Sequence, residues 1–345
     1  MAASGSRPLV AAHHRRFGAR SGRFRAPQRP RPPADTVPGV IRLGLCCTFR
    51  DAPIRFRRAT ATHALRLPPD ERRAKLAALC DANATALHAA VAFCGAHGIG
   101  AFRVNSQVWP LATHPQAGFE LAALPGGPGI AARYRAAGEL ARSLGVRLSL
   151  HPDQFVVLSS DREDVVASSL CELEYQATVA GLIGADVVNV HAGGAYGDRA
   201  AALDRFARAV DRLSADARSR LTVENDDRVY TPAELLPLAR RTGLPLVYDV
   251  HHHRCHPDDL SVAEATDAAA ATWGDREPWT HLASPRDGWQ AANPRPHAGL
   301  VDPADFPEAW LGRRMTIDVE AKEKERAVLA IRDAVAAACL AAPRP

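Results

Sequence analysis

The chain has 345 residues, of which 47% are apolar, so it is long enough to bury one large core. Its formal charge of +5 is the balance of 43 basic and 38 acidic residues, and residues 1–39 alone hold eight Arg and one Asp. The remaining chain is close to neutral, which excludes a uniformly basic surface and requires any phosphate-binding groove to be local.

Cysteine usage and hydropathy indicate the cellular setting. The seven cysteines include no CxxC pair, as expected for reduced thiols in a cytoplasmic protein. No run of 18 apolar residues occurs, so we expect no transmembrane helix and no membrane partner. Residues 1–39 are rich in Arg and Pro, which predicts a disordered tail before a folded domain at 40–345.

Short apolar runs then alternate with longer stretches of helical periodicity. The runs are 40–46, 100–104, 146–150, 186–190, 220–224, 244–250, 279–283 and 315–320. The helical stretches are 69–97, 130–143, 161–182, 199–214, 232–242, 262–272 and 322–341. Continuous apolar runs are typical of parallel strands buried on both faces, and eight of them predict a single (β/α)8 barrel. A doubly wound open sheet is the alternative. No GxGxxG follows a strand, so we expect no nucleotide cofactor.

Two helix starts and one long loop have local signals. Ser160 with Glu163, and Thr231 with Glu234, have the spacing of a capping box. The Pro-rich segment 284–314 predicts a long loop between the seventh and eighth strands.

Side chains that bind metals recur at the carboxyl ends of the predicted strands. They are His114, His151, His191, Glu224, Asp249, His251, His252, His253, His281, His297 and Glu320. A single His or carboxylate there is usually an ordinary surface group, but barrel active sites form at this rim and the recurrence favours a divalent metal site. Two or three metals would suit phosphoryl chemistry, whereas one or two would suit sugar isomerisation; the residue types leave both open.

Several motifs together resemble the UV damage endonucleases. They include "IRLGLC" (41–46), "FRVNSQVWPLATHP" (102–115), "HPDQF" (151–155), "ENDD" (224–227) and "EAKEKE" (320–325), within a resemblance that spans roughly residues 40–335. The resemblance implies a TIM barrel that cuts damaged double-stranded DNA immediately 5′ to UV photoproducts and other lesions. It also implies divalent metal, with Mn²⁺ commonly favoured and Mg²⁺ or Zn²⁺ as alternatives.

The resemblance further implies roles for individual residues. The implied metal ligands are His114, His151, His191, Glu224, Asp249, His252, His281, His297 and Glu320. Among them, Glu224, Asp249 and Glu320 are also the implied catalytic residues. Gln154 and Phe155 match a pair that contacts the lesion, and Leu45 occupies the position of a lesion-contacting Tyr. Trp279 stands where some members carry a carboxylated Lys, so the expected number of metals is two or three.

Two other functions remain as alternatives. One is a metal-dependent sugar isomerase or epimerase on the same barrel, which would explain the carboxylates and His252 but not "HPDQF". The other is a non-catalytic protein that binds distorted DNA, although such a protein would be expected to have lost several ligands. For the endonuclease we expect a monomer that acts in the cytoplasm at the nucleoid.

Overall fold

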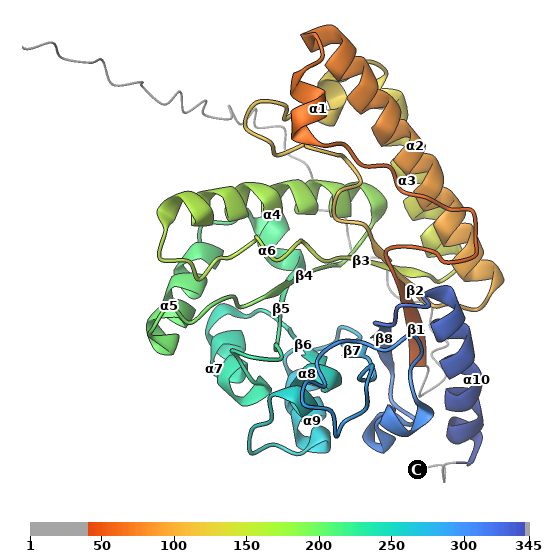
Figure 1. The fold of residues 1–345 in the computed structure, drawn as a ribbon, viewed down its shortest axis with the longest axis vertical. Coiled ribbons are helices and arrows are strands. Elements are labelled where there is room, and N and C mark those ends of the chain that lie inside the picture. Colours follow the sequence, from red (N-terminus) through yellow and green to blue (C-terminus); the bar gives the residue numbers. More distant parts are fainter. Residues whose placement is uncertain (1–40, 342–345) are drawn as a thin grey trace, which may run out of the picture. The chain divides into compact units, whose positions relative to one another are not determined.

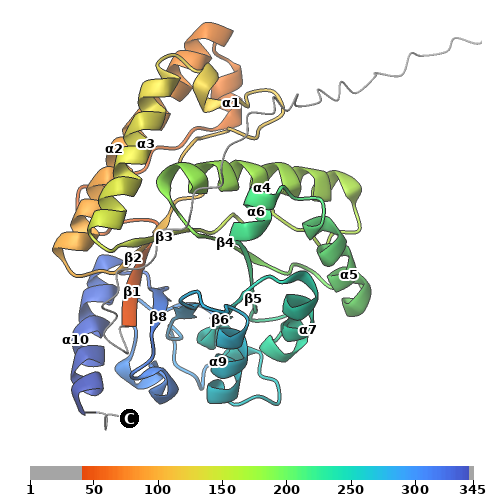
Figure 2. The same ribbon diagram turned by 180° about the vertical axis from the view of Figure 1, so that it is seen from behind.

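The computed structural model describes residues 41–341, which contain a closed barrel of eight parallel strands paired in chain order (Figures 1 and 2). The strands are β1 (Ile41–Cys46), β2 (Ala101–Val104), β3 (Arg147–Leu150), β4 (Val187–His191), β5 (Leu221–Glu224), β6 (Leu246–Asp249), β7 (Trp279–Leu282) and β8 (Met315–Val319). All eight predicted strands are present, so the (β/α)8 barrel is confirmed and the doubly wound sheet is excluded. The prediction for residues 1–39 lies outside the described residues.

Helices surround the barrel. They are α1 (Ala61–Leu65), α2 (Pro69–Ala96), α3 (Gly127–Ser143), α4 (Glu163–Ile183), α5 (Arg199–Val210), α6 (Ala215–Arg220), α7 (Pro232–Thr242), α8 (Val250–Cys255), α9 (Val262–Ala271) and α10 (Glu325–Ala341). All seven predicted helices are present, whereas the short α1, α6 and α8 were not predicted. Segment 284–314 is a loop, as predicted, that contains two short 3-10 turns.

One predicted helix start is confirmed and the other is wrong. Thr231 and Glu234 form a complete capping box at the start of α7, with Pro232 in the first turn. The Ser160 hydroxyl instead accepts the backbone N–H of Arg162 at 3.1 Å, and α4 begins only at Glu163. Ser160 therefore closes a tight turn before the helix.

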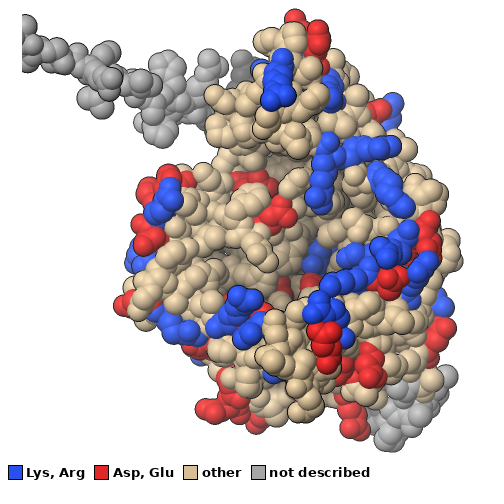
Figure 3. Space-filling model, viewed as in Figure 1, with Lys and Arg blue, Asp and Glu red and all other residues tan. Residues whose placement is uncertain are grey.

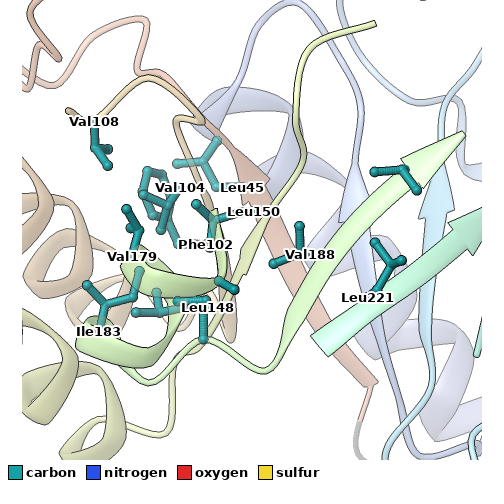
Figure 4. Close-up of a cluster of buried hydrophobic side chains, with 14 of the residues drawn as sticks. Leu45, Phe102, Val104, Val108, Leu148, Leu150, Val179, Ile183, Val188 and Leu221 are labelled. Carbon is teal, nitrogen blue, oxygen red and sulfur yellow. The ribbon is translucent and has the colours of Figure 1, made fainter. Parts of the chain in front are cut away.

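The main apolar core lies between the outer face of the barrel and the helices. Leu45, Phe102 and Leu150 are fully buried there on three successive strands (Figure 4). The predicted contact of Leu45 with a DNA lesion is therefore wrong, because this side chain is enclosed between the sheet and the helices. Side chains alternate along a strand, so its neighbour Gly44 faces the barrel interior, where an added Cβ would lie 2.3 Å from Asp318 Oδ1.

The amino-terminal end of the barrel is filled by a charged cluster around Glu277. Its carboxylate contacts the guanidinium groups of Arg42, Arg147 and Arg314 at 3.1, 3.5 and 3.3 Å. Arg147 also lies 4.5 Å from the ring centroid of Trp279, which is fully buried. These contacts close the end of the barrel opposite the predicted metal-binding rim.

Among residues 41–341, α2 is the one helix with the length and composition of a membrane span. Half of its apolar stretch is buried within the structure. It lies beside α3 in both ribbon views and also contacts β2 (Figures 1 and 2). Part of the apolar surface of α2 therefore packs against the barrel.

Candidate metal centre

The carboxyl ends of six strands, the short helix α8 and one loop bring together eight of the nine predicted ligands. These are His151, His191, Glu224, Asp249, His252, His281, His297 and Glu320, which are linked by contacts between imidazoles and carboxylates. Six of them line a cavity of about 810 Å³, namely His151, His191, Glu224, His252, His297 and Glu320. The cavity is large enough to admit part of a polymeric substrate to this cluster.

Glu224, at the end of β5, is at the centre of the cluster and is almost completely buried. Its Oε2 lies 3.1 Å from His151 Nε2 and 3.9 Å from His191 Nε2. Its Oε1 lies 2.9 Å from His281 Nδ1 and 3.4 Å from His252 Nδ1. One carboxylate thus faces imidazoles from strands on both sides of it, an arrangement suited to bridging two cations.

Neighbouring amides fix Glu224 and the strand beside it. The Asn189 amide on β4 donates to Glu224 Oε2 at 2.5 Å, and the Thr222 hydroxyl donates to Asn189 Oδ1 at 2.9 Å. Asn225 forms two hydrogen bonds with the backbone of Asp249, each 2.9 Å long. These bonds set the relative positions of the ends of β5 and β6.

Asp249 has one oxygen in a structural role and one that remains available. Its Oδ1 accepts the backbone N–H of His252 at 2.7 Å and so caps α8, which turns His252 toward the cluster. Its Oδ2 is buried without a hydrogen-bond partner, 3.4 Å from His252 Nδ1 and 3.8 Å from His281 Nδ1. A buried, unpartnered carboxylate oxygen beside two imidazoles fits a metal ligand, since it would otherwise be left desolvated.

The third side of the cluster is formed by Glu320 and His297. Glu320 Oε1 lies 3.4 Å from His281 Nδ1, and Oε2 lies 3.6 Å from His297 Nδ1. His297 belongs to the long loop after β7 and pairs with Pro285 in an isolated bridge. The ring of His251 packs edge-on against His297 with centroids 4.9 Å apart, so His251 contacts a candidate ligand from outside the three ligand groups.

Three groups of candidate ligands emerge. Each group places its ligand atoms within 4.8 Å of one another, and the groups share Glu224 and Asp249. The groups are His151–His191–Glu224, Glu224–Asp249–His252 and Asp249–His281–Glu320. Imidazole nitrogen and carboxylate oxygen together suit Mn²⁺, Fe²⁺ or Zn²⁺, and the shared carboxylates suit adjacent ions.

Charge within the cluster shifts its protonation equilibria. Burial would raise the pKa of the Glu224 carboxyl, but the imidazoles of His281 and His191 outweigh burial and hold that pKa well below its usual range. Burial would lower the pKa of His252, but the carboxylates of Asp249 and Glu224 outweigh it and raise that pKa well above its usual value. A divalent cation binding here would have to displace the proton from His252.

Two residues that the sequence analysis singled out, His114 and Trp279, do not line the cavity. His114 lies in the loop after β2, where its Nδ1 accepts the backbone N–H groups of Gln116 and Ala117, and it does not line the cavity. Its role as a ligand stays a prediction. Trp279 points into the opposite end of the barrel, and none of the three lysines, all within the described residues, lines the cavity.

Arg103 and Asp318 are site residues that the sequence reasoning did not identify. Arg103, on β2, contacts Glu320 and His281 from beneath the cluster, and Asp318 on β8 contacts Arg103. Strand alternation is the signal that would have revealed them. Asp318 precedes Glu320 by two residues and therefore shares its face of β8.

The predicted lesion-contacting residues lie on the loop that follows β3. Phe155 is 64% exposed, so it is not a core aromatic, and Gln154 lines the cavity. The loop is anchored on both sides of this pair: Gln107 donates to Asp153 Oδ2 at 2.6 Å, and the Val157 N–H donates to the Ser169 hydroxyl at 2.8 Å. A fixed base and an exposed tip allow the pair to reach a ligand outside the barrel.

Comparisons with known proteins agree with this geometry. Residues 41–339 match the family described as UV-endonuclease UvdE. The UV DNA damage endonuclease of Deinococcus radiodurans is 38% identical over 310 residues, covering 85% of this chain and 95% of that protein. The enzyme of the same name from Nostoc sp. is 31% identical over 84% of this chain and 89% of that protein. The crystal structure of SacUVDE has a TM-score of 0.76 at 26% identity, over 86% of this chain and 99% of that one.

The shifted pKa values predict how pH affects the metal-free protein. His252 stabilises the fold fully below its unfolded pKa, near 6.5, and this contribution is lost as pH rises through its raised folded pKa. Glu224 stabilises the fold above its unfolded pKa, near 4.5, and this contribution is lost as pH falls through its lowered folded pKa. We therefore expect the free energy of unfolding of chelator-treated protein, measured in urea, to be highest between about pH 4.5 and pH 6.5. It should decline as the pH falls below this range and as it rises above it.

Two His→Gln variants test whether the pH dependence of stability arises from the cluster. His252→Gln should weaken the decline on the alkaline side, because the imidazolium contacts of His252 with Asp249 and Glu224 are gone. His88→Gln, at an exposed position on α2, should leave the profile unchanged. A free energy of unfolding that stays constant above pH 6.5 in the unaltered protein would contradict the protonation of His252.

Proposed function

Because the chain belongs to the UV-endonuclease UvdE family, we propose that it is a metal-dependent endonuclease that nicks damaged double-stranded DNA. We place the cut immediately 5′ to UV photoproducts and other distorting lesions. We propose two or three divalent ions as cofactors, with Mn²⁺ as the preferred ion and Mg²⁺ or Zn²⁺ as alternatives.

The single observation that carries the proposal is the shared use of Glu224 and Asp249 by the three groups of ligands. Shared carboxylates would hold neighbouring ions close together, as in enzymes that clamp the attacking and leaving oxygens of a phosphodiester. Bound divalent ions would supply an activated water and stabilise the negative charge that develops on the phosphate. His151, His191, His252, His281, His297 and Glu320 would complete their coordination.

The chain's own residues orient this chemistry. The Nδ1 of His151 lies 3.1 Å from the carbonyl oxygen of Pro152, which would accept a hydrogen bond from a proton carried on Nδ1. The lone pair of Nε2 would then point toward Glu224, where it could bind a cation. Glu224 is held by Asn189, and Asp249 by its capping bond to α8. The ligands are therefore placed before a cation arrives, which lowers the cost of ordering them.

The surroundings of the cavity suit a DNA backbone. Arg228 and Arg295 line the cavity beside Asp227, which contacts both guanidinium groups at 3.7 and 3.4 Å. In the view of Figure 3, Lys and Arg side chains form a band beside a hollow in the surface. A local basic band on an almost neutral domain supports phosphate binding there.

We propose that Gln154 and Phe155 select damaged sites. An exposed aromatic ring on an anchored loop can stack on a base or enter a weakened base step. Kinking costs less free energy where a lesion has already disrupted stacking, so selectivity would follow from deformability without reading of the sequence. The loop's position beside the cavity supports this role.

Two alternatives are less well supported. A sugar isomerase or epimerase would use the same barrel, but the family match and the exposed Phe155 beside the site favour a DNA substrate. A non-catalytic protein that binds distorted DNA would not need eight converging ligand side chains. Neither alternative accounts for both the ligand groups and the exposed loop.

Nicking of UV-irradiated supercoiled plasmid in the presence of Mn²⁺ tests the activity. Glu224→Gln keeps the shape of the side chain but removes the charge that would hold two ions, so we expect nicking to fall by orders of magnitude. Glu264→Gln, in the exposed capping box of α9, is the matched control and should nick at the unaltered rate. Equal nicking by Glu224→Gln, or equal nicking of irradiated and intact plasmid, would contradict the proposal. Lesion binding without nicking would favour the non-catalytic alternative.

Lesion-binding titrations with unfolding measurements test the loop. The double variant Gln154→Ala and Phe155→Ala should lose about 1–3 kcal/mol of lesion-binding free energy per lost stacking contact, with unchanged stability. Leu144→Ala, which is exposed before β3 at the other end of the barrel, should bind lesions normally. Leu45→Ala, in the core, should instead cost about 2–5 kcal/mol of stability. A double variant that discriminates damaged from intact duplex as before would remove the assignment.

A further inference from the structure

A buried ion pair lies directly beneath the candidate metal centre. Arg103 on β2 is 8% exposed, and its Nε donates to Asp318 Oδ2 at 2.9 Å. Its Nη2 donates to Glu320 Oε1 at 2.5 Å and lies 3.2 Å from His281 Nε2. One guanidinium thus joins an interior carboxylate to two of the candidate ligands.

The route of Arg103 to Asp318 depends on a missing side chain. β1 lies between β2 and β8, and its Gly44 is paired in register with Asp318 on one side and Ala101 on the other. A Cβ at Gly44 would lie 2.3 Å from Asp318 Oδ1 and 3.2 Å from the Cβ of Ala101. Glycine at this position leaves the space in which Arg103 reaches across β1 to β8.

The contacts of Arg103 divide the roles of the Glu320 oxygens. Oε1 is held by the guanidinium, whereas Oε2 remains directed toward His297 at 3.6 Å. On the other side, His281 Nε2 faces Arg103 while Nδ1 faces Glu224 at 2.9 Å. A planar guanidinium with several fixed donors can hold the carboxylates of Glu320 and Asp318 in these orientations at once, which a lysine ammonium cannot.

The ion pair also balances charge among buried carboxylates. Glu224, Asp249, Asp318 and Glu320 all point into this end of the barrel, and Arg103 is the one Lys or Arg side chain among the described residues that contacts Glu320 or Asp318. Burying a guanidinium is costly unless its hydrogen bonds are satisfied, and here carboxylates on β8 satisfy them. The pair therefore suits a place where ligands must be held close despite their mutual repulsion.

Resting on the proposed metal centre, we propose that Arg103 is a positioning residue that, held by Asp318 and the space at Gly44, aims Glu320 at the bound metal ions. Replacing the guanidinium leaves all eight candidate ligands in the chain but removes the contact that orients Glu320. The consequence is weaker metal binding in a protein that still folds.

The test is a Mn²⁺ titration of the chelator-treated full chain, in which the EPR signal of free Mn²⁺ measures unbound metal. Arg103→Lys keeps the positive charge but loses the several fixed N–H donors of the guanidinium. Gly44→Ala keeps every charged group but displaces Asp318. We expect each to raise the Kd for Mn²⁺ by about 10–100-fold, the usual effect of losing a partner that orients a ligand. Asp318→Asn, with nearly the same shape, should act in the same direction and provides a third variant if another fails to fold.

Arg147→Lys is the matched control. Arg147 is also largely buried in the barrel, where it contacts Asp186 at 2.9 Å and the Thr316 hydroxyl at 2.7 Å, at the end away from the ligands. It should lower thermal stability and bind Mn²⁺ as tightly as the unaltered protein. Unchanged Kd values in the folded variants of Arg103, Gly44 and Asp318, or an equal rise in Arg147→Lys, would overturn the inference. An unaltered protein that binds no Mn²⁺ would contradict the proposed metal centre itself, and the inference with it.

Discussion

Glu224 carries an almost completely buried carboxylate at the carboxyl end of the barrel, and the rest of the rim is arranged around that charge. Isolated in such a place, a carboxylate would be strongly destabilised and would take up a proton. Imidazoles from β3, β4, β7 and α8 prevent this, and Asn189 adds a hydrogen bond. Because the four imidazoles come from different parts of the barrel, the position of Glu224 depends on its closure.

The barrel separates stability from chemistry by the alternation of side chains along its strands. Outward-facing residues such as Leu45, Phe102 and Leu150 pack against the helices and form the apolar core. Inward-facing residues are polar over much of the length of the barrel, from the Glu277 cluster at one end to Glu224 at the other. A substitution at an outward-facing position therefore affects mainly folding, whereas one at an inward-facing position of the rim affects mainly the site.

Periodicity in the sequence was sufficient to predict the barrel and most of its rim. Continuous apolar runs identified the eight strands, and polar residues in or just after the carboxyl-terminal parts of the runs identified most of the candidate ligands. The short α8 was not predicted, because Asp249 and Val250 read as the end of a strand; only the capping bond of Asp249 shows that a helix begins there. The failure at Ser160 has a similar cause, since a hydroxyl can close a turn as well as cap a helix.

The interior of the barrel was harder to predict than its rim. Leu45 was assigned to the DNA because the resemblance gives its position but not its direction, whereas pairing of Gly44 with Asp318 shows which residues face inward. Arg103 is not a metal-binding side chain and Asp318 lies two residues before the end of its strand run, so neither stands out from the sequence pattern. Their contact joins β2 to β8, and a contact between strands distant in sequence cannot be inferred from local pattern.

The central claim is that the three groups of side chains sharing Glu224 and Asp249 hold adjacent metal ions. Anomalous diffraction at the manganese absorption edge, from crystals of the full chain grown with Mn²⁺, tests it most directly. We predict anomalous peaks between Glu224 and the imidazoles of His151 and His191, and between Glu224, Asp249 and His252. The absence of any peak within bonding distance of Glu224, in crystals that bind Mn²⁺ elsewhere, would contradict it.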